Sequence, residues 1–410
     1  MEFLAMLSIF SRSLFLVLLV LVEAQASKAE THVSKLITSD ILSIDRIPNT
    51  QELFIGGYRG FLGKVRLSEE GARFEELMAP LSIDILVIKA FSAEEAVIGT
   101  SKGDIYRLVN GKLQHVKALS EYKDPILDMA VKGNEVWAVG PRGLIAKSKD
   151  RGKTWETLII DEVKKSVTLT SNSSTTWFLG VSNIIPETFV FSATVNGKKV
   201  EEDEDYYLDA NAGNIEIVNP LDESSNLKLE FSYLPGPQFQ AGDVSLNTVS
   251  YGMGTVLIAG EFGTVIILDE DGSWKSIYED VRQEEVVMPY WIESSASDQN
   301  VVMVGAGGVA TMTHNGGETW VQHNMKNDNG IFDVALSGEG GAIAAGAVGT
   351  VAILKGGEWD IADRSSLDLI AWLKAVISLG DGSHLVAGGR GSLVLYKNDT
   401  WHKLVLRSVN

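Results

Sequence analysis

Residues 331–361 read IFDVALSGEGGAIAAGAVGTVAILKGGEWDI, and this stretch contains the pattern that decides the fold. Two glycines separated by two residues, Gly346 and Gly349, stand between short apolar runs, and a Gly-Gly turn then precedes Trp359. The runs are rich in β-branched residues and bounded by turn residues, which is typical of β-strands. The stretch therefore predicts four strands, from an inner to an outer one, at 332–337, 341–346, 350–354 and 358–362.

The same pattern recurs along the sequence. The second glycine of each pair falls at position 60, 103, 143, 263, 308, 349 or 391. A large apolar residue follows each pair after a turn: Phe74, Leu113, Trp155, Trp274, Trp320, Trp359 and Trp401. Five of the six spacings are 40 to 45 residues, close to one four-stranded propeller blade, and the sixth is 120. We therefore expect an all-β fold, a seven-bladed β-propeller, with an insertion after its third blade.

The inserted segment has a different texture. Between about 163 and 238 the glycine pair is missing, and Asn196-Gly197 between apolar runs is a hairpin signal. Pro235-Gly236-Pro237 marks an exit linker. We expect an immunoglobulin-like β-sandwich over 163–238, with propeller blades 1–3 over 40–162 and blades 4–7 over 239–410. The acidic run Glu201–Asp205 is interpreted as a solvated loop, and a Ca²⁺ site is the alternative, although the EF-hand spacing is absent.

The N-terminus predicts export. Arg12 precedes the apolar run 14–22, and Ala24-Gln25-Ala26 has the form of a cleavage site, so residues 1–26 are interpreted as a signal peptide. The expected location is the periplasm, an equivalent lumen, or the exterior. The 410 residues include no cysteine, which excludes disulfides and Cys-ligated zinc. A net charge of −19 argues against a general nucleic-acid binder.

Two of the turns carry a sharper signature. Residues 148–155 read SKDRGKTW and match the Asp-box, S-x-D-x-G-x-T-W, while residues 313–320, THNGGETW, match it with Thr for Ser and Asn for Asp. The short carboxylate or amide can accept backbone N–H groups of the turn, and the glycine takes a positive φ. These motifs are therefore expected to be structural, with the tryptophan packed between blades.

Asp-boxes of this form, each preceded by an apolar strand and a G-x-x-G turn, resemble the neuraminidase-repeat propellers of bacteria. The style is most similar to the photosystem II stability and assembly factor family and its non-photosynthetic relatives, over about 40–160 and 243–408. The resemblance implies an exported binding scaffold for the assembly of membrane complexes, without catalytic residues. We accordingly expect a protein client, no enzyme activity, no cofactor and no metal; the oligomeric state stays open.

Four cations mark a candidate site. Arg59, Lys102, Arg142 and Arg390 all precede the second glycine of their turns, and the first and last blades are neighbours across the ring closure. The four are therefore expected on one rim, where they could bind a carboxylate-rich or C-terminal segment of a client. An arginine patch is also what the family resemblance implies. The insertion leaves from a link at the same end, so it should lie on the same face.

The alternative is a secreted glycan-binding or sialidase-like propeller. Arg46-Ile47-Pro48 matches the short R-I-P motif of sialidases. The two hypotheses predict different ring axes: an enzyme should gather carboxylates and arginines there with perturbed pKa values, and a scaffold should lack such a cluster.

Overall fold

The computed structural model describes residues 34–409, apart from 69–70, 78–81, 159–161, 171–174, 182–183, 192–204, 219–225, 235–243, 269–271, 273, 278–280, 282–288, 326–327, 363–366 and 368. The signal peptide, the Asn196-Gly197 turn, residues 201–204 of the acidic run and the Pro235–Pro237 linker lie outside the described residues, so they stay predictions. Within the described part of the protein, no helix is long and apolar enough to cross a membrane.

Strands from the described residues form seven sheets of the same design, numbered 1 to 7 in sequence order. Sheet 1 contains β1 (Ile41–Arg46), β2 (Glu52–Gly57), β3 (Leu62–Ser68) and β4 (Gly71–Glu76). Sheet 2 contains β5 (Ile85–Ser92), β6 (Glu95–Thr100), β7 (Asp104–Val109) and β8 (Lys112–Ala118). Sheet 3 contains β9 (Asp128–Lys132), β10 (Glu135–Gly140), β11 (Leu144–Ser148) and β12 (Glu156–Leu158).

The other four sheets follow the insertion. Sheet 4 contains β19 (Leu246–Gly252), β20 (Thr255–Gly260), β21 (Val265–Leu268) and β22 (Trp274–Ser276). Sheet 5 contains β23 (Trp291–Ala296), β24 (Val301–Gly305), β25 (Val309–Thr313) and β26 (Val321–Asn324). Sheet 6 contains β27 (Ile331–Leu336), β28 (Ala342–Gly346), β29 (Val351–Lys355) and β30 (Glu358–Ile361). Sheet 7 contains β31 (Leu373–Ser378), β32 (His384–Gly388), β33 (Leu393–Lys397) and β34 (Thr400–Leu404).

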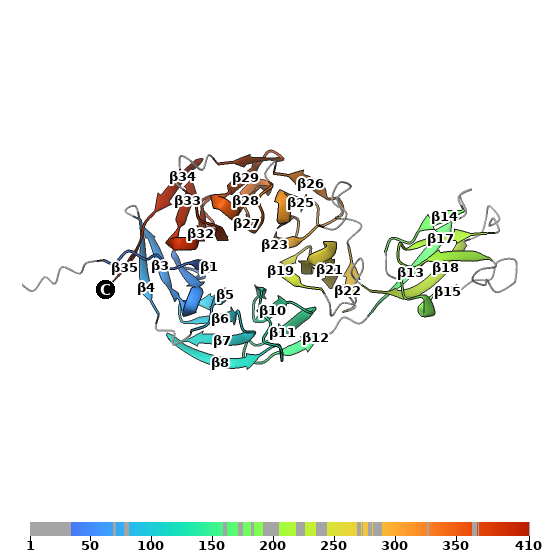
Figure 1. Ribbon diagram of the computed structural model, residues 1–410, viewed down its shortest axis with the longest axis horizontal. Coiled ribbons are helices and arrows are strands. Elements are labelled where there is room, and N and C mark those ends of the chain that lie inside the picture. Colours follow the sequence, from blue (N-terminus) through green and yellow to red (C-terminus); the bar gives the residue numbers. More distant parts are fainter. Residues whose placement is uncertain are drawn as a thin grey trace, which may run out of the picture.

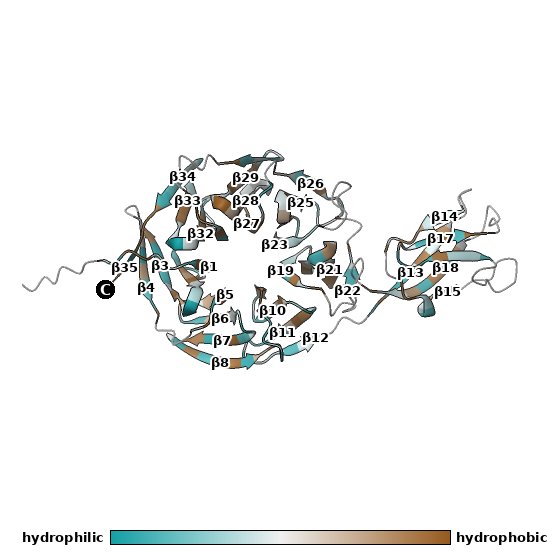
Figure 2. Cartoon of the chain, viewed as in Figure 1, coloured by the Kyte–Doolittle hydropathy of each residue, from teal (hydrophilic) through white to brown (hydrophobic). Residues whose placement is uncertain are grey.

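The sheets stand around a common axis as a β-propeller (Figure 1). Each first strand contacts the first strand of the next sheet, and β31 of sheet 7 contacts β1, which closes the ring. The predicted order from inner to outer strand is confirmed in sheet 6, where the order is β27-β28-β29-β30. Figure 2 shows why the sheets must pack against one another. Second strands such as β28 are hydrophobic, whereas hydrophobic and hydrophilic residues alternate along the outer strand β8. Burial of both faces of each sheet therefore needs the two neighbours.

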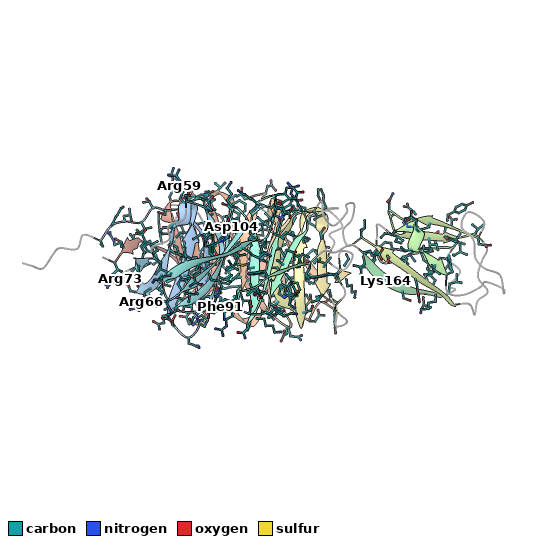
Figure 3. All side chains as sticks on the ribbon, turned by 90° about the horizontal axis from the view of Figure 1, so that it is seen from below. Arg59, Arg66, Arg73, Phe91, Asp104 and Lys164 are labelled. Carbon is teal, nitrogen blue, oxygen red and sulfur yellow. The ribbon has the colours of Figure 1, made fainter. Side chains whose placement is uncertain are left out.

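The two ends of the ring differ. One end, the turn face, carries the G-x-x-G turns between second and third strands, together with the links between sheets. The opposite end, the hairpin face, carries the other two hairpins of each sheet. Figure 3 shows Arg59 on the turn face, with Arg66 and Phe91 toward the hairpin face.

The C-terminus seals the ring. Sheet 7 supplies all four of its own strands, as expected, and β35 (Leu406–Ser408) then pairs in parallel with β4, the outer strand of sheet 1. The described part of the segment before Thr38 adds no strand to sheet 7. It is joined to β35 by an antiparallel bridge between Leu36 and Arg407. Both described ends therefore meet at sheet 1, so closure joins residues far apart in the sequence.

The Asp-box loop between β11 and β12 has the expected hydrogen bonds. Asp150 Oδ1 accepts the backbone N–H groups of Lys153 and Thr154 at 3.0 and 2.8 Å, and Ser148 Oγ accepts that of Gly152 at 2.9 Å. Gly152 has φ +77°, and Trp155 donates its indole N–H to the Gly152 carbonyl at 3.0 Å. The 313–320 loop is stabilised by the equivalent side chains, with Thr313 in place of the serine and Asn315 in place of the aspartate.

The predicted aromatic landmark holds in sheet 1. In sheets 4, 6 and 7 the tryptophan of the outer strand is opposite the residue five positions after the second glycine, in the pairs Leu268–Trp274, Leu354–Trp359 and Tyr396–Trp401. In sheet 1 the residue five positions after Gly60 is Val65, and it is opposite Phe74. Phe74 is further from its glycine pair because the β3–β4 hairpin continues past this pair to Ser68 and Gly71. Phe74 therefore occupies the equivalent place, and it is stacked on Phe61 at 4.8 Å.

The inserted segment forms two three-stranded sheets. One contains β13 (Val163–Thr170), β18 (Asn226–Tyr233) and β15 (Val190–Phe191), and the other contains β14 (Thr176–Phe178), β17 (Asn214–Ile217) and β16 (Tyr206–Asp209). Aromatic side chains fill the space around them, with Phe189 stacked on Phe231 at 5.6 Å. Figures 1 and 3 show these sheets beside the ring, so the expectation that they cover the turn face is wrong. The reason is that β13 begins five residues after the outer strand β12, at the rim.

Candidate functional site

The structure places the four predicted cations on the turn face, in consecutive sheets 7, 1, 2 and 3. All four are exposed. Arg59, Arg142 and Arg390 have left-handed backbones, with φ of 54°, 58° and 59°. The left-handed region costs an L-residue roughly 1–2 kcal/mol. Glycine would fit these positions more easily, so the backbone does not explain the choice of arginine.

Aspartates fix the arginine turns. Asp84 Oδ1 accepts the backbone N–H of Arg59 at 2.9 Å, and Asp40 Oδ1 accepts that of Arg390 at 2.6 Å. The carbonyl of Asp40 also accepts the N–H of Tyr58 at 3.3 Å. Asp40 therefore connects the turn of sheet 1 with the turn of sheet 7. Because these carboxylates accept hydrogen bonds from the main chain, they do not pair with the guanidinium groups of Arg59 and Arg390.

An aromatic pair lies between these two turns. Tyr58 and Trp372 meet edge to face with ring centroids 6.3 Å apart, and 44% of Tyr58 is exposed. Neither Arg59 nor Arg390 makes an ion pair with a described residue. A hollow of about 410 Å³ adjoins Arg59 and is lined by Asp40, Phe61 and Glu76 among others. Exposed arginine beside aromatic rings is the composition of binding hot spots.

The other two cations have different surroundings. Arg142 binds Asp124 through Nε at 3.1 Å, and its guanidinium lies over the Tyr122 ring at 4.5 Å. Tyr122 is 73% exposed. Lys102 is exposed, and its backbone N–H donates to Thr100 Oγ1 at 3.4 Å. We call Arg59, Lys102, Arg142 and Arg390 the basic arc.

The remaining sheets give the turn face a second character. The left-handed position is occupied by Phe262 in sheet 4, Gly307 in sheet 5 and Val348 in sheet 6. Val348 is 51% exposed, and the links nearby expose Tyr290 and Ile370. The turn face is therefore basic over sheets 7 and 1–3 and apolar over sheets 4–6.

The ring axis holds a charged cluster, although the scaffold hypothesis predicted that none would be there. A cavity of about 420 Å³ is lined by the inner strands. Its charged residues, the axial cluster, are Asp45, Lys89, Asp128, Glu293, Asp333 and Lys374. Lys89 Nζ lies 3.9 Å from Asp128 Oδ1, and Thr248 Oγ1 donates to Glu293 at 2.7 Å. No arginine is among the described lining residues.

Burial changes the titration of this cluster. Burial raises the pKa of Glu293 well above its usual value, and the charges of Asp128 and Asp333 raise it further. Burial also raises the pKa of Asp333 to about 7, although the Val376 and Val334 N–H groups oppose this. Burial works against the charge of Lys89, but Asp128 and Asp45 outweigh it and raise the pKa of that lysine. The axis therefore gathers acidic groups that hold protons unusually well beside charged lysines.

Hydrogen bonds explain why carboxylates are there. An inner strand pairs on one edge only, so its other edge presents unpaired N–H groups. Asp45 accepts the N–H of Ala90 in the next inner strand at 2.6 Å. Asp128 and Asp333 do the same for Val249 and Val376, at 2.9 and 2.5 Å. The axial carboxylates thus join neighbouring sheets. Within the described residues, no group of three or more His, Asp or Glu side chains could hold a metal ion.

Sequence reasoning found the cations but missed their partners. Tyr58 and Trp372 flank the turns without a motif of their own. The aspartates had a usable signal, because Asp40 and Asp84 each directly precede an inner strand. Three axial carboxylates also had a usable signal, because Asp128, Glu293 and Asp333 are each opposite the residue that directly precedes the first glycine of the pair.

No protein-family model matches this protein, and no curated protein matches it. Solved structures are similar in fold. One described as YCF48 bound to D1 peptide has 12% identity and a TM-score of 0.54, covering 89% of this chain and 96% of the other. YCF48 from Cyanidioschyzon merolae has 15% identity, a TM-score of 0.55 and coverages of 89% and 97%. A streptogramin B lyase has 8% identity, a TM-score of 0.56 and coverages of 89% and 95%. At these identities the likeness shows the β-propeller fold alone.

Proposed function

We propose that the protein is an exported, non-catalytic scaffold that binds a protein client and assists the assembly or stability of a membrane or envelope complex. In this proposal residues 1–26 are a signal peptide, the seven sheets are seven blades, and 163–238 is an immunoglobulin-like module. The observation that carries it is the pair Arg59 and Arg390, which are exposed beside Tyr58 and have no ion-pair partner among the described residues. Asp40 joins their two turns through the N–H groups of Tyr58 and Arg390. The structural neighbour that holds a peptide supports a protein client for this fold.

The chemistry of the basic arc selects the client segment. Guanidinium groups form paired hydrogen bonds with carboxylates, and the C-terminal carboxylate of a client or an acidic stretch within it supplies these. The protein as a whole has a net charge of −19, so an acidic client is repelled everywhere except at a local cationic surface. Docking would therefore be oriented by the arc, while the apolar half of the turn face would contact less polar client surface.

The test is an affinity pull-down of the mature protein from its own envelope extract, read by mass spectrometry, with wild type and an Arg59→Ala/Arg142→Ala/Arg390→Ala variant. The matched control, Arg66→Ala/Arg73→Ala/Arg407→Ala, removes three exposed arginines from sheet 1 and β35. We expect one membrane complex to be enriched by wild type and control and lost from the turn-face variant. Equal enrichment by all three proteins would remove the basic arc from the proposal.

A glycan-cleaving propeller is the second candidate, favoured by the axial cluster. Two observations weigh against it. The axial aspartates accept backbone N–H groups of neighbouring strands, which assigns them a structural task. Arg46, from the R-I-P match, lines a cavity between sheets 7 and 1 and not the axial one. Turnover of a fluorogenic sialoside, lost in Asp128→Ala or Asp333→Ala, would establish this candidate instead.

A further inference from the structure

Another cavity opens at the ring closure, on the hairpin face. It has a volume of about 770 Å³ and lies between sheets 7 and 1. Arg46, Leu53 and Leu67 line it from sheet 1, and Leu379 and Leu395 line it from sheet 7. We call it the closure pocket. Its volume is in the range of small-molecule sites, roughly 300–1,000 Å³.

The closure pocket lies beyond the Val65–Phe74 pair, where the β3–β4 hairpin is longer than its counterpart in sheet 7. Past that pair Leu67 is opposite Ala72 and Ser68 is opposite Gly71, whereas the β33–β34 hairpin continues for only one pair past Tyr396–Trp401. Leu67, Ser68 and Gly71 line the pocket. Apart from Leu67 the residues of this extension that line the pocket are small, so the space between sheets 1 and 7 is open to a ring from outside.

The wall of the pocket is apolar. Leu53 is 1% exposed, and Leu67, Leu379, Leu395 and Leu404 pack against the same hydrophobic cluster. A polar molecule would leave these side chains poorly covered. An aromatic or aliphatic body is therefore the portion of a ligand that this wall fits.

The mouth of the pocket is cationic. Among the described lining residues, Arg46, Lys397 and Lys403 stand against one carboxylate, Asp381. That carboxylate accepts the backbone N–H of Ser383 at 3.0 Å and the Ser383 hydroxyl, and these bonds lower its pKa. Arg46 makes no ion pair with a described residue, and a Cβ built on Gly380 would lie 2.5 Å from its Nη1. The β31–β32 hairpin thus holds the Arg46 guanidinium at the mouth.

We propose that the closure pocket binds a small amphipathic anion, whose apolar body contacts the leucine wall and whose carboxylate or sulfonate binds Arg46. This site is separate from the basic arc, at the other end of the ring. The two sites share no residue, so either can fail without the other.

Two fluorescent probes test the proposal: the anionic 8-anilinonaphthalene-1-sulfonate and the neutral N-phenyl-1-naphthylamine, each titrated into the folded full-length protein. Wild type should bind both saturably, one per protein molecule. Arg46→Ala should weaken the anionic probe by about tenfold or more and the neutral probe by less than about twofold, since a charge-assisted hydrogen bond is lost. Arg66→Ala, on the opposite face of the same sheet, is the matched control.

Filling the cavity tests the apolar half. Leu67→Phe enlarges a side chain of the apolar wall, and it should weaken both probes by about tenfold or more. Near-UV circular dichroism checks folding, and Leu395→Phe fills the same space from sheet 7 if Leu67→Phe does not fold. Absence of saturable binding, unchanged affinities in the filled variant, or equal losses of both probes in Arg46→Ala would each overturn the proposal.

Discussion

Charged residues gather in two regions of this propeller, and the two use charge in opposite ways. At the axis, Asp45, Asp128 and Asp333 are committed to backbone N–H groups of neighbouring inner strands. On the turn face, aspartates bind the main chain while the guanidinium groups of Arg59 and Arg390 stay exposed. The charged groups at the axis therefore hold the ring closed, whereas the guanidinium groups on the turn face remain available to bind a partner.

The comparison shows why perturbed pKa values alone do not identify an active site. The strongest shifts are at the axis, where burial acts on groups already engaged in holding the ring. The most accessible cations are at the turns, outside that buried environment. Substitutions at the axis should therefore change stability, and substitutions at the turns should change binding.

The largest expected effect is on stability at the axis. Asp128→Ala removes the acceptor for the N–H groups of Met129 and Val249. We expect the free energy of unfolding to fall by about 3 kcal/mol in urea denaturation, with client binding unchanged. Asp360→Ala, on the exposed outer strand β30, is the control and should cost less than about 0.5 kcal/mol. Lost binding with normal stability would mean that the axis is functional.

The next effect is on binding at the turn face. Arg59→Ala/Arg390→Ala should weaken capture of an acidic client segment by about 10- to 100-fold, measured by isothermal titration with the purified client. Arg142→Ala alone should weaken it by less than about fivefold, because that guanidinium already pairs with Asp124. Neither change should lower Tm by more than a degree or so. A larger loss from Arg142→Ala would move the centre of the site away from the ring closure.

A pH effect belongs to the axis. The pKa of Asp333 is raised to about 7 by burial, above its value in the unfolded state. Its contribution to stability is therefore fully present below about pH 4 and is lost as the pH rises to about 7. Asp333→Asn removes this loss, so the stability of wild type relative to the variant should fall as the pH rises from 4 to 8, with most of the fall below about pH 7. A constant difference over this range would show that Asp333 does not take up a proton on folding.

The repeat made the ring predictable. Glycine pairs fix the turns and apolar runs fix the strands, so the strand order of sheet 6 and the shared face of Arg59 and Arg390 followed from sequence spacing alone. Local signals of this kind need no knowledge of distant contacts. The Asp-box bonds of Asp150 were predictable for the same reason, since every partner lies within four residues.

Distant contacts were not predictable. The parallel pairing of β35 with β4 joins segments from opposite ends of the sequence, and nothing local in Leu406–Ser408 announces it. The greater length of the β3–β4 hairpin, which continues past the Val65–Phe74 pair to Ser68 and Gly71, also has no counterpart in the repeat. The role of the axial carboxylates was not predictable because Asp128 and Asp333 bind the inner strands of neighbouring sheets, which are distant in the sequence.

The smallest expected effect separates backbone need from side-chain choice at the turn face. Arg390 has φ 59°, so Arg390→Gly relieves left-handed strain while loosening the unfolded state, and Arg390→Ala keeps the strain. We expect Arg390→Gly to be about 0.5 kcal/mol more stable than Arg390→Ala in urea denaturation, although both lose client binding equally. The reciprocal change, Gly307→Arg in sheet 5, should cost about 1 kcal/mol. If the glycine variant is instead less stable than the alanine variant, Arg390 contributes to the structure of its turn. The division between a structural axis and a turn face available for binding would then not hold at Arg390.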